Sequence, residues 1–158
     1  MKRLVMFLYF LIWTFSYSYA SQKDANANEH SDNYKIVFQE PAYFQNVRFN
    51  DRASFDYAYF QSYAIFTNSL FNFISDFSNT RFDSIVLFTY SNFRDETYFI
   101  GNHFQFEAQF AEVNFFLNTS FTNSSFYSRV NFQASKFHSI ADFSSSHFYD
   151  FVDFGNAH

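Results

Sequence analysis

Phenylalanine recurs along this chain at two alternating intervals, and this spacing restricts the possible folds more than any other feature. The steps between successive Phe alternate between six and five residues without a break. Twenty-two of the 29 Phe follow this register, at positions 38, 44, 49, 55, 60, 66, 71, 77, 82, 88, 93, 99, 104, 110, 115, 121, 126, 132, 137, 143, 148 and 154. A biased composition alone would not produce such a register, so the spacing indicates a repeat protein with a shared Phe core.

A second column of residues precedes each Phe by two positions and favours short strands. From Ala42 to Val152 this column is small or β-branched, with Asn102 as the one exception. Residues two apart lie on the same face of a strand, so the small residue and the Phe both point inward. In a straight strand, a residue five positions after an inward Phe would point outward, because five is odd. The chain must therefore turn a corner between units to bring the next pair inward.

Short strands joined by regular corners predict an all-β fold, a quadrilateral parallel β-helix with a Phe-stacked core. Two 11-residue units give four sides and 22 residues per turn, so residues 42–154 form about five coils, roughly 25 Å tall at the usual strand spacing. An α-helix is disfavoured, because its 3.6-residue turn would separate successive Phe by about 140°. The spacing leaves open whether the second residue after Phe in each six-residue step, such as Asp51 or Phe73, points inward or outward.

The N-terminus has the pattern of a secretory signal peptide. Lys2 and Arg3 precede an apolar run over residues 4–13, and Ser18 and Ala20 form a small-x-small cleavage site. We expect residues 1–20 to be a signal peptide cleaved after Ala20, with export to the periplasm or the exterior. The alternative is an uncleaved anchor, but the run is short of the roughly 20 residues of a full span. We therefore expect no stable membrane span after cleavage.

The remaining chain divides into two parts. Residues 21–35 are polar with little periodicity, which is typical of a lead-in or an N-terminal cap, and residues 36–158 carry the repeat.

Several stretches fit a tandem motif of a small residue, Asn or Asp, Leu or Phe, and two further residues. Among them are VNFQA at 130–134, ADFSS at 141–145 and, for its first three positions, VNF at 113–115. On these residues the chain resembles the pentapeptide-repeat family over positions 36–154, in a Phe-rich variant that adds a sixth residue to every second unit. The resemblance implies a right-handed quadrilateral β-helix. It says little about function, since one fold serves many functions.

Composition excludes several classes of site. There is no Cys and there are two Gly, so disulfides, thiolate zinc sites and Gly-rich phosphate loops are excluded. The net charge of -5 becomes -7 once Lys2 and Arg3 are removed, which argues against binding nucleic acid through its phosphates. His103 and His147 are predicted in one column about 10 Å apart, too far to share a metal. Asp76 and Asp142 share a column with Tyr98 and Ser120 between them, which is also unconvincing as a carboxylate pair. We therefore predict no catalytic, cofactor or metal site.

Exposed aromatic and branched residues form the candidate partner surface. The residue before Phe faces solvent, and one such column begins with Tyr43, Ile65 and Leu87. Three further tyrosines fall in nearby coils: Tyr57, Tyr59 and Tyr63. Such an apolar patch is typical of a partner surface, although these residue types also favour strands in general. The uncovered C-terminal coil suggests a second contact, a homodimer through the end that exposes Phe154.

Three functions compete on this evidence. The first is a non-enzymatic exported scaffold that binds an unknown protein or a component of the cell envelope. The second is a DNA mimic that inhibits a type II topoisomerase; the family's best-known members inhibit DNA gyrase in this way, but the role requires a cytosolic location. The third is a glycan-binding β-helix, in which exposed Tyr stack on sugars.

Overall fold

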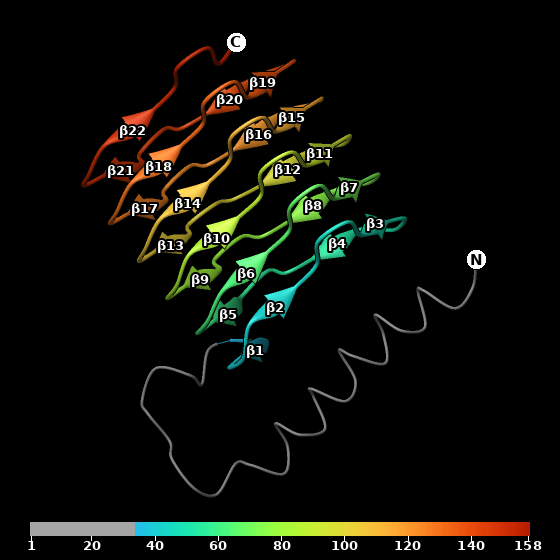
Figure 1. The fold of residues 1–158 in the computed structure, drawn as a ribbon, viewed down its shortest axis with the longest axis vertical. Helices are drawn as coiled ribbons and strands as arrows, with labels where there is room; N and C mark the ends of the chain where they lie inside the picture. The colour runs from blue at the N-terminus through green and yellow to red at the C-terminus, as the bar shows by residue number, and fades with distance from the viewer. Residues whose placement is uncertain (1–33) are drawn as a thin grey trace, which may run out of the picture. The chain divides into compact units, whose positions relative to one another are not determined.

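The structure, a computed structural model, describes residues 34–158, all of which belong to one compact unit. The predicted signal peptide and most of the predicted lead-in lie outside these residues. The described chain forms an all-β parallel solenoid of about five turns, as the Phe register predicts (Figure 1).

Short strands build four parallel sheets, one for each side of the coil. Sheet A contains β1 (Ile36–Phe38), β5 (Ala58–Phe60), β9 (Arg81–Phe82), β13 (His103–Phe104), β17 (Ser125–Phe126) and β21 (His147–Phe148). Sheet B contains β2 (Ala42–Tyr43), β6 (Ala64–Ile65), β10 (Val86–Leu87), β14 (Ala108–Gln109), β18 (Val130–Asn131) and β22 (Val152–Asp153). Sheet C contains β3 (Arg48–Phe49), β7 (Leu70–Phe71), β11 (Asn92–Phe93), β15 (Asn114–Phe115) and β19 (Lys136–Phe137). Sheet D contains β4 (Ala53–Ser54), β8 (Ser75–Asp76), β12 (Thr97–Tyr98), β16 (Thr119–Ser120) and β20 (Ala141–Asp142).

Strands pair with the equivalent strand one coil away, which fixes the register of the whole solenoid. In sheet B, for example, Val86 pairs with Ala64 on one side and with Ala108 on the other. Each partner is 22 residues distant, so the predicted coil length is confirmed. Equivalent residues therefore stack in columns along the solenoid, and a side chain's neighbours are set by its position in the repeat.

The core consists of four columns of stacked Phe rings. Phe66 lies parallel to Phe44 and to Phe88, with ring centroids 4.8 Å apart in both pairs. Facing columns interleave edge to face: the Phe77 ring lies 5.4 Å from Phe66 and 5.2 Å from Phe88, at interplanar angles of 89° and 86°. Both arrangements are favourable for aromatic pairs, so the core gains more than area burial alone.

The five-residue steps form tight turns, which we call the five-residue corners. Phe88, Thr89, Tyr90 and Ser91 make one of them, closed by a 3.0 Å bond from the Ser91 N–H to the Phe88 carbonyl. The second residue after Phe has positive φ throughout: Asn46, Tyr57, Asn68, Asn79, Tyr90, Gly101, Glu112, Asn123, Ala134, Ser145 and Asn156. A type II turn needs this conformation, and Asn and Gly tolerate it best.

Buried hydroxyls tie successive five-residue corners together. Ser91 Oγ donates to the Phe66 carbonyl of the preceding coil at 2.6 Å and accepts from the Ser69 N–H at 3.1 Å. The carbonyls bonded one coil back in this way are those of Phe44, Phe55, Phe66, Phe99 and Phe121. The residues of this column are therefore small, as the sequence predicted, and several of them also form hydrogen bonds between coils.

Asn102 departs from this column in the structure as it does in the sequence. Its Oδ1 accepts the Thr80 N–H at 3.0 Å, as a hydroxyl would. Its Nδ2 is buried and is the one such side-chain atom without a hydrogen-bond partner among residues 34–158.

The six-residue steps form wider bends, which we call the six-residue corners. The second residue after Phe points outward, which answers the question that the spacing left open. Phe73, Phe106 and Leu117 occupy this position and are 51%, 53% and 46% exposed. These corners therefore place extra apolar side chains on the surface without enlarging the core.

Ring burial declines toward the C-terminal coil. Core rings from Phe60 to Phe132 are at most 1% exposed, whereas Phe154 is 44% exposed and Phe137, Phe143 and Phe148 are half-buried.

Candidate functional site

Sheet B carries a stripe of exposed apolar residues on its first three coils. Tyr43, Ile65 and Leu87 pair in register on β2, β6 and β10, and Tyr63 lies at the six-residue corner just before β6. Tyr43 is 64% exposed and Tyr63 48%, while Ile65 and Leu87 are half-buried. We call these four residues the sheet B stripe. Beyond Leu87 the column continues with Gln109, so the stripe has a polar boundary.

The two other predicted residues, Tyr57 and Tyr59, lie outside the stripe and contact charged groups of the chain itself. The Tyr59 hydroxyl donates to Asp83 Oδ2 at 2.5 Å, and its ring packs against Tyr34 in a tilted arrangement with centroids 5.0 Å apart. Tyr57 is 43% exposed at a five-residue corner, with the Lys35 ammonium 5.2 Å from its ring centroid. The structure therefore brings together four of the six predicted residues.

The contacts of Tyr59 continue to Arg81 and shift the pKa of both groups. Burial and the hydrogen bond to Asp83 raise the pKa of Tyr59. Burial alone would lower the pKa of Arg81, but the Asp83 carboxylate, 2.8 Å from Arg81 Nε, outweighs it and raises that pKa. Arg81 also lies over Tyr59, with its guanidinium carbon 5.7 Å from the ring centroid. These contacts link Tyr59 on β5 with Arg81 on β9 and with Asp83, so they connect two successive coils of sheet A.

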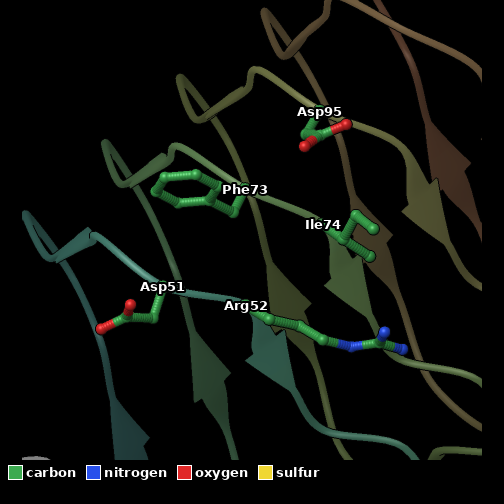
Figure 2. Close-up of a pocket in the computed structure, with 5 residues that line it drawn as sticks. All are labelled: Asp51, Arg52, Phe73, Ile74 and Asp95. Carbon is green, nitrogen blue, oxygen red and sulfur yellow. The ribbon is translucent and has the colours of Figure 1, made fainter.

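A pocket lies at a six-residue corner between sheets C and D, and the sequence did not single it out. Its lining residues are Asp51, Arg52, Phe73, Ile74 and Asp95, around a cavity of about 200 Å³. Figure 2 shows Phe73 between Asp51 and Asp95, which occupy the equivalent position on the neighbouring coils. The signal in the sequence was an apolar residue between two acidic ones at intervals of 22 residues.

The Arg52 side chain leaves this pocket to pair with Asp76 on sheet D. Arg52 Nη2 lies 2.7 Å from Asp76 Oδ2. Burial would raise the pKa of Asp76, but hydrogen bonds from Ser78 together with Arg52 outweigh it and hold that pKa below its usual value. The positive charge at the pocket rim is therefore already neutralised.

The columns considered for metal or acid–base chemistry are placed as expected. His103, Ser125 and His147 pair successively in sheet A, so the two histidines lie two coils apart. Asp76 and Asp142 share a column with Tyr98 and Ser120 between them. Across residues 34–158, no group of three or more His, Asp or Glu is arranged to hold a metal ion.

A second aromatic group on sheet A was also missed by sequence reasoning. Tyr127 and Tyr149 stack face to face with centroids 4.8 Å apart, and His103 lies against Tyr127 at 4.6 Å. Tyr127 and Tyr149 each directly follow a core Phe of sheet A, so they lie in one column, 22 residues apart.

The described chain has no helix long and apolar enough to cross a membrane.

Comparison with known proteins identifies the repeat. A family model described as pentapeptide repeats, with 9 copies, matches residues 34–81. No curated protein and no solved structure matches the chain. The match confirms the resemblance drawn from the motifs: the chain carries pentapeptide repeats over residues 34–81, and the same Phe register and coil pairing continue without a break to the last coil.

Proposed function

We propose that this protein is a non-enzymatic exported scaffold that presents the sheet B stripe to a partner protein or a component of the cell envelope. The observation that carries the proposal is the stripe itself, in which Tyr43 is 64% and Tyr63 48% exposed beside the half-buried Ile65 and Leu87. Exposed apolar patches rimmed by polar residues are typical of interaction sites. Export is supported by the pattern of residues 1–20, which lie outside the described part of the chain.

The rigidity of the solenoid suits this role. Each coil is bonded to the next through four sheets and four stacked ring columns, so the stripe residues keep their spacing. A preorganised surface loses little entropy when it binds, which favours a specific contact over a small area.

The two other functions have weaker support. A DNA mimic needs an acidic surface, yet Asp56, Asp76 and Asp83 each pair with a cation of the chain. A glycan-binding face needs free aromatic faces, and Tyr127 and Tyr149 each use one ring face to stack on the other. The homodimer through the C-terminal coil stays a prediction, for which light scattering is the direct test.

The location is tested by intact mass of the native protein after cell fractionation. We expect a mass that begins at Ser21, in a fraction outside the cytoplasm. A full-length mass in the cytoplasm would contradict export and would direct attention to a topoisomerase inhibition assay.

The surface is tested by cross-linking and affinity capture from the envelope fraction. The variant Ile65→Gln/Leu87→Gln introduces the residue type that Gln109 already provides in this column, so the fold is expected to persist. The matched control is Tyr98→Ser in the equivalent outward column of sheet D, where Ser120 follows. We expect the double variant to lose the captured partner and the control to retain it. Equal capture by both variants would remove the stripe from the proposal.

A further inference from the structure

The pocket between sheets C and D combines an exposed aromatic ring with two acidic side chains that lack a cation. Phe73 is 51% exposed and lies between Asp51 and Asp95 (Figure 2). The salt bridges within residues 34–158 involve other carboxylates, those of Asp56, Asp76 and Asp83. Asp95 uses Oδ1 to accept the Glu96 N–H at 2.8 Å, which leaves its second oxygen available.

The cations closest in sequence to the pocket have other partners. Arg52 pairs with Asp76, and Arg94 donates from Nη1 to Asn72 Oδ1 at 3.2 Å. The remaining nearby carboxylate, Glu96, accepts a hydrogen bond from the Tyr98 hydroxyl. Asp51 and Asp95 therefore face the pocket without a positive partner from their own chain.

The protein shows elsewhere what such a combination binds. On sheet A the Arg81 guanidinium lies over the Tyr59 ring, 5.7 Å from its centroid, while its Nε bonds to Asp83 at 2.8 Å. Arg129 lies over Phe151 at the same 5.7 Å. In the first case a planar guanidinium covers a half-buried ring and also pairs with a carboxylate, and in the second it covers a ring that is 57% exposed. The sheet C–D pocket supplies the ring and the carboxylates but no arginine.

We propose that this pocket binds an arginine side chain of a partner protein. The guanidinium stacks on Phe73 and pairs with Asp51 or Asp95, while Ile74 contacts the aliphatic part of the side chain. Arginine fits better than lysine, because its planar group can cover a ring and bond a carboxylate at the same time. The pocket lies at a corner between sheets C and D, away from the sheet B stripe, so the proposal holds whether or not the stripe binds a partner.

The test is an NMR titration of the ¹⁵N-labelled protein with N-acetyl-L-arginine methylamide. We expect saturable shifts at the backbone amides of Phe73, Ile74 and Asp95, which weaken at high salt because the charges are exposed. The equivalent capped citrulline, which has nearly the same shape without the charge, is expected to cause no such shifts. Equal shifts with citrulline, or a stronger response to capped lysine, would overturn the assignment.

Two variants and one matched control locate the contact. Phe73→Ser is expected to weaken binding about two- to fivefold through loss of the cation–π contact, and Asp51→Asn/Asp95→Asn to abolish it. The fold is expected to tolerate Phe73→Ser, because serine already occupies this corner position at 62, 84, 128 and 139. The control is Phe106→Ser at the opposite six-residue corner, whose column neighbours are Ser84 and Ser128. Unchanged binding in Phe73→Ser, with core amide shifts preserved, would exclude the pocket.

Discussion

The five-residue and six-residue corners alternate along the same coil, yet they restrict the sequence very differently. A five-residue corner needs a residue with positive φ and a small inward residue, often a buried hydroxyl such as Ser91 that bonds the preceding coil. A six-residue corner accepts Asp51, Phe73 or Leu117 at one position, because that position faces solvent. The tight corners thus carry the information for the fold. The wide corners are free to carry surface chemistry, and both Tyr63 and the sheet C–D pocket lie there.

The sharpest test of the difference between the two kinds of corner replaces a Phe with Ala at each of them. Phe99→Ala removes a fully buried ring at the start of a five-residue corner and is expected to cost about 3–5 kcal/mol. Phe73→Ala removes a half-exposed ring at a six-residue corner and is expected to change stability by less than about 0.5 kcal/mol. Urea denaturation measures both. Comparable losses in the two variants would show that the six-residue corner contributes to the core after all.

Much of the fold was predictable because a single residue type marks the core at fixed intervals. The register of Phe gave the four sides and the coil length, and pairs such as Val86 with Ala108 confirm them. The direction of the Phe73 side chain was not predictable. An apolar residue two positions after a core Phe, in a six-residue step, could point either into the core or toward solvent. The bonds of Ser91 were also missed, because small size already explained that position.

The candidate site was most predictable where its residues share one column. Tyr43, Ile65 and Leu87 stand 22 residues apart and the sequence groups them, whereas the contacts of Tyr59 with Asp83 and Arg81 of the next coil were not predicted. Charge pairing between coils depends on side-chain direction, which spacing alone does not give.

A second test breaks the hydrogen bonds that link five-residue corners. Ser91→Ala removes the donor to the Phe66 carbonyl and the acceptor for the Ser69 N–H, which leaves two buried backbone groups unpaired. The expected loss is about 1–3 kcal/mol. Ser84→Ala, at a six-residue corner, is the matched control and is expected to be nearly neutral. Thermal denaturation compares them, and equal melting temperatures for wild type and Ser91→Ala would contradict the role of the hydroxyl.

A third test uses two alanines that occupy different positions of the same kind of turn. Ala134 has φ of 55°, which costs an L-residue about 1–2 kcal/mol, so Ala134→Gly is expected to stabilise the protein by about 1 kcal/mol. Ala111 holds the preceding turn position, without positive φ, so Ala111→Gly is expected to destabilise by about 0.4–1 kcal/mol through a more flexible unfolded chain. The opposite signs are the prediction, and a shift in the same direction for both variants would contradict it.

The smallest effect comes from Asp76, which joins the two kinds of corner. Asp76 Oδ1 accepts the Ser78 N–H at 3.1 Å in a five-residue corner, and its Oδ2 pairs with Arg52 of a six-residue corner. Although burial opposes the charge, these bonds hold the pKa of Asp76 below its unfolded value. Its contribution to stability is therefore complete above about pH 5 and is lost as the pH falls through the folded pKa.

Comparison of wild type with Asp76→Asn across this range isolates the effect. We expect the wild type to be more stable by about 1 kcal/mol or less at pH 7, since a half-exposed ion pair is worth little, and the difference to shrink toward pH 3. Arg52→Gln removes one of the two partners and should reproduce part of the loss, with the remainder carried by Ser78. A stability difference between wild type and Asp76→Asn that grows as the pH falls would mean that burial, rather than the bonds across the two corners, sets the charge state of Asp76.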